Sequence, residues 1–315
     1  MFTGVGGFEL GIQQAHNIKQ SNEDWSKTRD ENERGHRSFI EPEVRLYLER
    51  NKPPLCVGVC EWDKYSSIVL QKRLRGVKNY GDATKINTDE LPDFDLLVGG
   101  FPCQAFSIAG KRRGFEDTRG TMFFEIARVL KAKRPEYFVL ENVKGLLSHD
   151  KGKTFLTIIS TLQELGYNVE WGVVNSRYFG VPQNRERVFI IGCLRERGRS
   201  KVFPLSRTNR ESTCEYREEY KISNRSPREA KWQDNSPCMA ARDYKDPKVV
   251  LDYQKIRKLT PRECERLQGF PDDWTLVELP NGKLMSDTQR YKQMGNAVTV
   301  NVVQAIMENL IGEYR

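Results

Sequence analysis

The sequence contains no run of eighteen apolar residues, the length of a membrane-spanning helix, which excludes a helical membrane protein. The residues after Met1 also lack the basic cluster and apolar core of a signal peptide. Metal ligands are scarce, because His16, His36 and His149 lie in polar segments without metal-ligand spacing. We therefore expect an intracellular protein without a metal site.

Cysteines are few and poorly placed for cross-linking. The chain has seven, an odd number at wide spacing and without a secretory signal, which argues for reduced thiols. Cys56 and Cys60 are the nearest pair, but the segment that holds them is typical of an apolar strand, not of half a zinc site. Most of the cysteines are predicted to be small buried side chains.

Charge and length set broad limits. A net charge of +8 favours a polyanionic partner, although many basic proteins only carry solvated lysines. The 315 residues suit one large domain with a smaller one.

Short apolar runs alternate with amphipathic helical patterns along the chain. Helices are predicted over Thr121–Lys131 and Thr154–Leu165, where apolar residues recur on one face. This alternation predicts an α/β fold with a doubly wound, mostly parallel sheet, in which ligands bind at the carboxyl ends of the strands. The runs typical of buried parallel strands are Cys56–Glu61, Asp95–Gly100, Tyr137–Leu140 and Val188–Cys193.

Two stretches break this rhythm and suggest the domain limits. Residues 17–45 are rich in charged and amide side chains and are predicted to form an exposed insertion in a first domain, 1–195. Residues 196–247 lose clear periodicity, as a small irregular domain would, and this small region is placed at 196–255, with its remainder in 256–315. Over 256–315 the chain ends in the pattern Asn301–Ile311, which predicts a terminal helix that returns to the sheet.

A glycine-rich turn opens the chain, in residues 2–8, and leads into a helical pattern. Glycines there allow a cofactor to approach the backbone. Glu61 and Trp62 at a predicted strand end suit an adenosine, with the carboxylate on the ribose and the indole on adenine. A solvated acid beside a core tryptophan is an equally good local interpretation. Asp82, before the next strand, could reach the adenine amino group.

Cys103 differs from the other cysteines. It follows a predicted strand on a loop with proline, glycine and polar neighbours, which favours a nucleophile over inert packing. The next loop, 110–120, carries four basic residues and three glycines, as a mobile lid over a phosphodiester would. Glu141 ends a further strand at the same edge. Arg185 and Arg187 have period-two spacing and face one side, although such arginines are usually surface ion-pair residues.

Together these segments resemble the cytosine-5 DNA methyltransferases, and the Gly99–Thr121 segment is closest to the bacterial restriction-modification type. The resemblance covers almost the whole chain outside 13–55 and 196–255. Its segments, in chain order, are the glycine turn, Glu61-Trp62, Gly81-Asp82, Pro102–Gln104, Glu141–Val143, Gln183–Arg187, Arg257–Cys264, Gln268–Pro271 and Gln293–Val298.

The resemblance implies a catalytic role for four residues. The Cys103 thiolate would add to C6 of cytosine, so that C5 can attack the methyl group of S-adenosylmethionine. Glu141 would hydrogen-bond N3 and the exocyclic amine, and burial would raise its pKa in the direction needed. Arg185 and Arg187 would hold the O2 side and favour the thiolate. The base must flip out of the duplex, and residues 104–120 would close behind it.

The resemblance also implies the cofactor pocket and the partners. S-adenosylmethionine, with S-adenosylhomocysteine as product, would be the cofactor, without metal. Double-stranded DNA would be the substrate, and a cognate restriction endonuclease would be the functional partner. The protein would be prokaryotic or viral, and would act as a monomer in the cytoplasm. The pocket residues implied are Phe2, Gly4, Val5, Gly7, Glu61, Trp62, Asp82, Ala83, Met122 and Asn296.

Three alternatives remain open from the sequence. A tRNA cytosine-5 methyltransferase would use the same motifs, and the short stretch 199–235 that would read the target is compatible with it. A non-catalytic nucleic-acid-binding relative is a second alternative, although every chemical residue is present. A nicotinamide oxidoreductase is a weaker third, because it gives no role to Glu141 or to the arginine pair.

Overall fold

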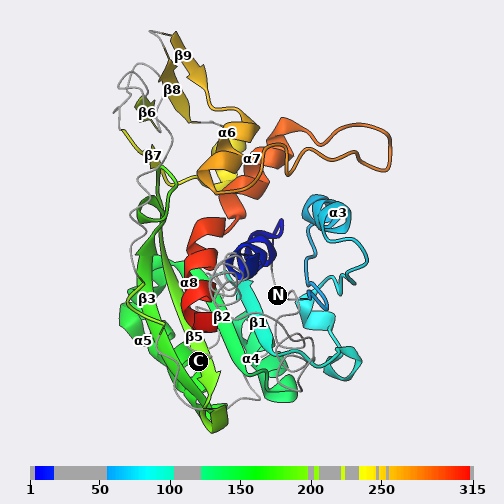
Figure 1. Cartoon of the computed structure of the whole chain (residues 1–315), viewed down its shortest axis with the longest axis vertical. Helices are drawn as coiled ribbons and strands as arrows, with labels where there is room; N and C mark the ends of the chain where they lie inside the picture. The colour runs from blue at the N-terminus through cyan, green and yellow to red at the C-terminus, as the bar shows by residue number, and fades with distance from the viewer. Residues whose placement is uncertain are drawn as a thin grey trace, which may run out of the picture.

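A four-stranded mixed sheet, in the order β1-β2-β5-β3, lies at the centre of the large part of the molecule (Figure 1). In the computed structural model the described residues are 4–17, 55–102, 122–197, 202–205, 221–223, 234–245, 248–252 and 255–312. The strands of this sheet are β1 (Leu96–Gly100), β2 (Tyr137–Val143), β3 (Tyr167–Asn175) and β5 (Glu186–Leu194).

The α/β fold predicted from the sequence is confirmed, with a difference in strand direction. β1 and β2 are parallel, as expected, but β5 is antiparallel to both β2 and β3. The prediction of a parallel strand over Val188–Cys193 is therefore wrong. The connection 176–185 between β3 and β5 is too short for a parallel crossover, which needs a dozen or more residues.

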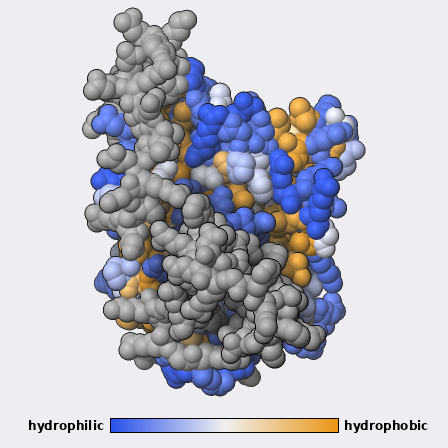
Figure 2. Space-filling model, viewed as in Figure 1, coloured by the Kyte–Doolittle hydropathy of each residue, from blue (hydrophilic) through white to orange (hydrophobic). Residues whose placement is uncertain are grey.

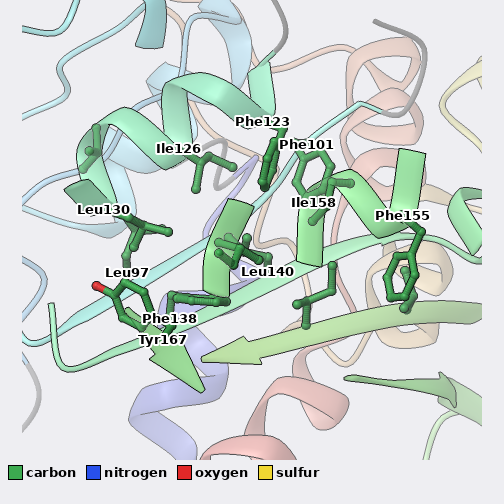
Figure 3. Packing of buried hydrophobic residues seen from close by; sticks show 14 of the residues in the cluster. Leu97, Phe101, Phe123, Ile126, Leu130, Phe138, Leu140, Phe155, Ile158 and Tyr167 are labelled. Carbon is green, nitrogen blue, oxygen red and sulfur yellow. The ribbon is translucent and has the colours of Figure 1, made fainter. Parts of the chain in front are cut away.

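Two amphipathic helices cover one face of the sheet, close to where they were predicted. They are α4 (Met122–Lys133) and α5 (Lys153–Glu164). Figure 3 shows Phe123, Ile126 and Leu130 of α4 directed at the sheet, above Phe138 and Leu140. These side chains are fully buried, and each large apolar one contributes about 1.5–3 kcal/mol relative to exposure.

The opposite face is covered by both ends of the described chain. Residues 7–17 are helical, and α8 (Val300–Gly312) packs beside them over Val139 and Phe189 of the sheet. Glycine permits the close contact, since a Cβ on Gly11 would lie 2.7 Å from the Cβ of Val303. The first helix and the last one thus form a single layer.

The upper part of the molecule in Figure 1 contains a small antiparallel sheet and two helices. The sheet is formed by β6 (Lys221–Ser223), β8 (Val249–Asp252) and β9 (Lys255–Lys258), and the helices are α6 (Pro261–Leu267) and α7 (Asp287–Asn296). A short parallel pairing of β4 (Gln183–Asn184) with β7 (Ser236–Pro237) joins this part to the large sheet.

The predicted strand Cys56–Glu61 does not form. Val59 makes one isolated β-bridge with Asn79, and the residues after Val59 are held by hydrogen bonds that involve side chains. The Asn79 Oδ1 accepts from the Glu61 N–H at 3.0 Å, and the Cys60 thiol donates to the Gly81 carbonyl at 3.0 Å. Helix α3 (Lys64–Arg73) follows directly.

Short 3-10 turns link the larger elements: η1 (Ala83–Lys85), η2 (Thr88–Glu90), η4 (Lys144–Leu147), η5 (His149–Gly152), η6 (Ser176–Tyr178), η7 (Arg195–Arg197) and η8 (Ala241–Tyr244). Of the predicted insertion 17–45, only residue 17 lies within the described part. On the face in Figure 2, hydrophilic residues make up most of the described surface. No helix among the described residues is long and apolar enough to span a membrane.

Candidate active site

A buried ion pair lies at the carboxyl end of β2. The Glu141 Oε1 is 2.8 Å from the Arg187 Nε, and both side chains are only about one-sixth exposed, at 16% and 15%. Gly100 of β1 is the register partner of Glu141, and a Cβ there would lie 3.0 Å from the Glu141 Oε2. Glycine at this position therefore leaves room for the carboxylate.

Two opposing effects set the protonation of Glu141. Burial raises the pKa of this carboxyl, because an anion is poorly solvated there. The guanidinium groups of Arg187 and Arg185 act against this, and burial prevails. The pKa of Glu141 therefore lies above its ordinary value, the direction expected from the sequence.

Cys103 lies outside the described residues, as do residues 104–121. The chain enters that segment from Gly100 at the edge where Glu141 stands. Phe101 is buried, and its carbonyl accepts a hydrogen bond from the Asn142 Nδ2 at 2.7 Å, whereas Pro102 is exposed. The start of the thiol segment is thus tied to β2, one residue beyond Glu141.

The two arginines engage different groups. Arg187 reaches Glu141, whereas Arg185 is 2% exposed and directs its terminal nitrogens at backbone carbonyls. Its Nη1 donates to the Met239 carbonyl at 2.8 Å, and its Nη2 donates to the Ala297 carbonyl at 2.8 Å and to the Gly295 carbonyl at 3.2 Å. Arg185 therefore joins β4 and β5 to the segment around Met239 and to the end of α7.

A contact missed from the sequence joins both arginines. The Cys238 sulfur lies 3.4 Å from the Arg185 Nη1 and 3.8 Å from the Arg187 Nη2. Both arginine side chains thus reach the same thiol, as expected for two residues predicted to face one side of the strand. Nothing in the sequence around Cys238 signals the contact, because it depends on the pairing of β4 with β7.

The remaining described cysteines are free thiols. Burial raises the pKa of Cys60 to about 11 and that of Cys264 to about 12, so that both stay protonated at neutral pH. Neither competes as a nucleophile, and both are buried as predicted.

The glycine turn and Glu61 come together through a hydrogen bond. The Glu61 Oε2 accepts from the Gly4 N–H at 3.1 Å, and its Oε1 accepts from the Asp63 N–H at 2.8 Å. Burial raises the pKa of Glu61. Gly4 has a φ of +62°, and a Cβ there would meet none of the described residues within 4 Å. Open space thus borders the turn beside a buried carboxylate.

The other residues expected at a cofactor border this region. Trp62 is 77% exposed, which leaves its ring free to stack on a ligand and is not consistent with a core tryptophan. Asp82 caps η1 by accepting from Thr84, and this bond lowers the pKa of Asp82. Ala83 is buried in a small cluster against which Met122 packs.

Residues near Asn296, the C-terminal member of the expected cofactor site, contact the glycine turn. A Cβ on Gly7 would lie 2.8 Å from the Cγ1 of Val298, and Val5 shares a buried cluster with Ala297. Asn296, next to Ala297, is exposed. Phe2 lies outside the described residues. Within the described part, no three His, Cys, Asp or Glu side chains group as metal ligands.

Comparison with known proteins gives consistent matches. A family model described as C-5 cytosine-specific DNA methylase matches residues 1–238 and 206–312. Type II methyltransferase M.SsoII from Shigella sonnei is 42% identical over 299 residues, which are 85% of this chain and 77% of that protein. Type II methyltransferase M.NlaX from Neisseria lactamica is 35% identical over 338 residues, covering 98% and 94%.

The fold is also similar to that of solved structures. The S. pombe Dnmt2 methyltransferase superimposes with a TM-score of 0.67 at 18% identity, over 99% of this chain and 97% of that one. A DNA modification methyltransferase encoded within an E. coli prophage gives a TM-score of 0.58 at 16% identity, over 99% and 97%. At these identities the likeness concerns the fold alone.

Proposed function

The chain belongs to the C-5 cytosine-specific DNA methylase family, and we propose that it methylates a flipped cytosine of duplex DNA through Cys103. It is a DNA cytosine-5 methyltransferase of the type II restriction-modification kind. The observation that carries the mechanism is the Glu141–Arg187 pair, 2.8 Å apart on the edge where Gly100 leads into the Cys103 segment.

The reaction begins with the base, because cytosine C5 is a poor nucleophile. The Cys103 thiolate forms a bond to C6, and the displaced electron pair makes C5 nucleophilic enough to take a methyl group. S-adenosylmethionine, when bound, supplies that methyl group. Loss of the C5 proton then returns the electron pair and expels the Cys103 thiolate, which restores the aromatic base.

Glu141 stabilises the charge that develops on the ring as the thiolate adds. A carboxyl with a raised pKa retains a proton that it can donate to N3 while it accepts from the exocyclic amine. Arg187 orients this carboxyl and can turn its remaining N–H groups to the O2 side. Arg185 supports the site indirectly, because both of its Nη atoms are bonded to backbone carbonyls.

The cofactor pocket is proposed between the glycine turn and the Glu61–Trp62 corner. Open space beside Gly4, the exposed Trp62 ring and the capped Asp82 fit an adenosyl group that carries a short cationic chain. Met122 and Ala83 would form the floor, and Asn296 would close the pocket from α7. Phe2 completes the proposed set.

DNA recognition is assigned to the part above the large sheet. We propose residues 196–255 as the target-recognition region, between a catalytic domain over 1–195 and a last segment over 256–315. The base would flip because its C6 is inaccessible in a duplex, and residues 104–120 would close over it. We further propose that the protein acts as a monomer in the cytoplasm of a prokaryote or of a virus-infected cell, and that it is paired with a cognate endonuclease.

Bisulfite sequencing tests the reaction and the nucleophile together. The chain and its Cys103→Ser variant are expressed in a host without cytosine methylation, with Cys56→Ser as the thiol control. We expect protected cytosines in one short sequence context for the chain and for the control, and none for Cys103→Ser. Protection by Cys103→Ser would refute the thiolate mechanism. Unprotected DNA with methylated tRNA would favour the tRNA enzyme.

A further inference from the structure

A tryptophan outside the proposed pocket holds the glycine turn. The Trp274 indole N–H donates to the Val5 carbonyl at 2.7 Å, across 269 residues of sequence. Val5 lies between Gly4 and Gly6, whose φ angles are +62° and +90°. Since glycine is freer than other residues in that region, the peptide between them needs an external partner to stay in one orientation.

The ring of Trp274 also packs on the turn. A Cβ on Gly6 would lie 3.7 Å from the Cζ2 of Trp274, and one on Gly7 would lie 3.1 Å from the Phe270 ring. The two rings contact each other, with centroids 5.8 Å apart. The turn therefore rests on an aromatic pair from the segment that follows α6.

Trp274 is itself fixed from the side of α3. The Arg73 guanidinium lies over the indole, 5.1 Å from its centroid. The Arg73 Nε donates to the Trp274 carbonyl at 2.9 Å, and its Nη2 donates to the Asp273 carbonyl at 2.7 Å. A side chain held by packing and by its neighbours' hydrogen bonds keeps its donor in place at little entropic cost.

A buried ion pair anchors the backbone around Trp274. The Glu265 carboxylate is fully buried, lies 3.2 Å from the Arg290 guanidinium of α7, and accepts from the N–H groups of Asp273 and Thr275. Asp273 has a φ of +57°, a conformation that persists only where the surroundings fix it. The loop that carries Trp274 is therefore rigid on both sides of the indole.

From these contacts we propose that Trp274 is a positioning residue for cofactor binding, acting through the Val5 carbonyl. The inference rests on the proposed function, in which the glycine turn lies against S-adenosylmethionine. Without the indole N–H, the Val5 peptide can rotate between its two flexible neighbours, and only part of the molecules present the binding conformation. The apparent affinity falls by that fraction, while the bound complex reacts normally.

The Trp274→Phe variant of the full chain tests this, because phenylalanine keeps an aromatic ring beside Phe270 and Arg73 and removes the indole N–H, and the control below loses the same ring volume. We expect the Kd for S-adenosylhomocysteine, measured by calorimetry, to rise about 3- to 10-fold, as for one neutral hydrogen bond. The KM for S-adenosylmethionine rises equally and kcat is unchanged. Trp171→Phe, at a tryptophan that is 48% exposed and in edge-to-face contact with Phe155, is the matched control.

The outcomes separate the inference from the proposed function. An unchanged Kd in Trp274→Phe, or a loss confined to kcat, overturns the positioning role. If the unaltered chain binds no S-adenosyl compound, the proposed function fails and this inference fails with it. Where Trp274→Phe does not fold, Arg73→Met applies the same test by loosening the indole, with an expected rise in KM of about 2- to 3-fold and unchanged kcat.

Discussion

At the scale of single residues, the carboxyl of Glu141 is the group whose chemistry depends most on its surroundings. It is buried enough to favour the neutral form, yet Arg187 lies 2.8 Å away and favours the anion. The net effect is a pKa above the ordinary value of a glutamate, with the partner that orients the carboxyl still in place. A carboxyl in bulk water would be almost wholly ionised at neutral pH and could accept but not donate.

The proton on Glu141 predicts a pH dependence. Its raised pKa means that the protonated form, which is the active one in our proposal, is lost as pH rises through that pKa. We expect kcat to decline there, and we expect Glu141→Gln to lose about 100- to 1000-fold in kcat and to lack this decline. Single-turnover methyl transfer measured against pH is the test.

A second carboxyl provides the control for that experiment. Glu186 pairs with Lys144 on the surface and is 45% exposed, so Glu186→Gln should retain both the rate and the alkaline decline. A decline that persists in Glu141→Gln would mean that another group titrates, and would contradict the assigned role.

At the scale of elements, the contact between helix 7–17 and α8 depends on missing side chains. We expect Gly11→Ala to lower the free energy of unfolding by about 1–3 kcal/mol, because its methyl group would overlap Val303. This loss exceeds the gain of about 1 kcal/mol that alanine gives inside a helix. Denaturant unfolding measures the difference.

Gly145→Ala is the matched control for that helix contact, because a Cβ there meets nothing within 4 Å. Its midpoint of unfolding should remain close to that of the unaltered chain. A Gly11→Ala variant as stable as this control would show that α8 shifts away at little cost.

The elements also show how far the sequence could predict the fold. Helices α4 and α5 were predicted within two residues, because their apolar faces follow the helical period without interruption. Strand β3 was missed, because its apolar residues alternate with Asn168, Glu170 and Gly172 and do not form the continuous apolar run on which the predicted strands were based. The strand is held in place by pairing with β5 and by packing of the Phe203 ring, which would lie 2.9 Å from a Cβ on Gly172.

The candidate site was predictable only in part, for a similar reason. Glu141 lies on the apolar run that forms β2, so its place at the sheet edge follows from local pattern, whereas the apolar run before Glu61 forms no strand. The burial of Arg185, its contact with Cys238 and the donor of Trp274 all depend on partners more than fifty residues away. No local pattern encodes such a hydrogen bond.

At the scale of the whole molecule, the first turn and the C-terminal part of the described chain meet at the proposed cofactor pocket. The glycine turn contacts Val298 on one side and Trp274 on the other. Lys292 of α7 lies 3.3 Å from Asp63, next to the proposed adenosine corner. The proposed domain 1–195 is therefore incomplete without the segment 256–315, and the large sheet cannot be covered on both faces without α8.

The pH dependence of global stability adds a prediction at this scale. Burial raises the pKa of Glu9 to about 7, and its Oε2 has no hydrogen-bond partner among the described residues. The folded state thus holds a proton that the unfolded chain releases near pH 4.5, so stability falls as pH rises from there through 7.

Glu9→Gln removes this dependence. We expect it to match the unaltered chain at pH 4.5 and to be more stable at pH 8, by up to about 3 kcal/mol. Urea unfolding at both pH values measures the difference. An equal gain at both values would contradict a titration of Glu9 and indicate a packing effect.

The shared layer of helix 7–17 and α8 also delays folding during synthesis of the chain. A ribosome adding 5–20 residues per second takes about 15–60 s to pass from the first of these helices to the last. During that interval Phe8 and Ala15, buried in the finished protein, have no partner from α8. A nascent chain therefore carries an incompletely packed glycine turn until α8 has been made, and this layer cannot form sooner than that interval after the turn is synthesised.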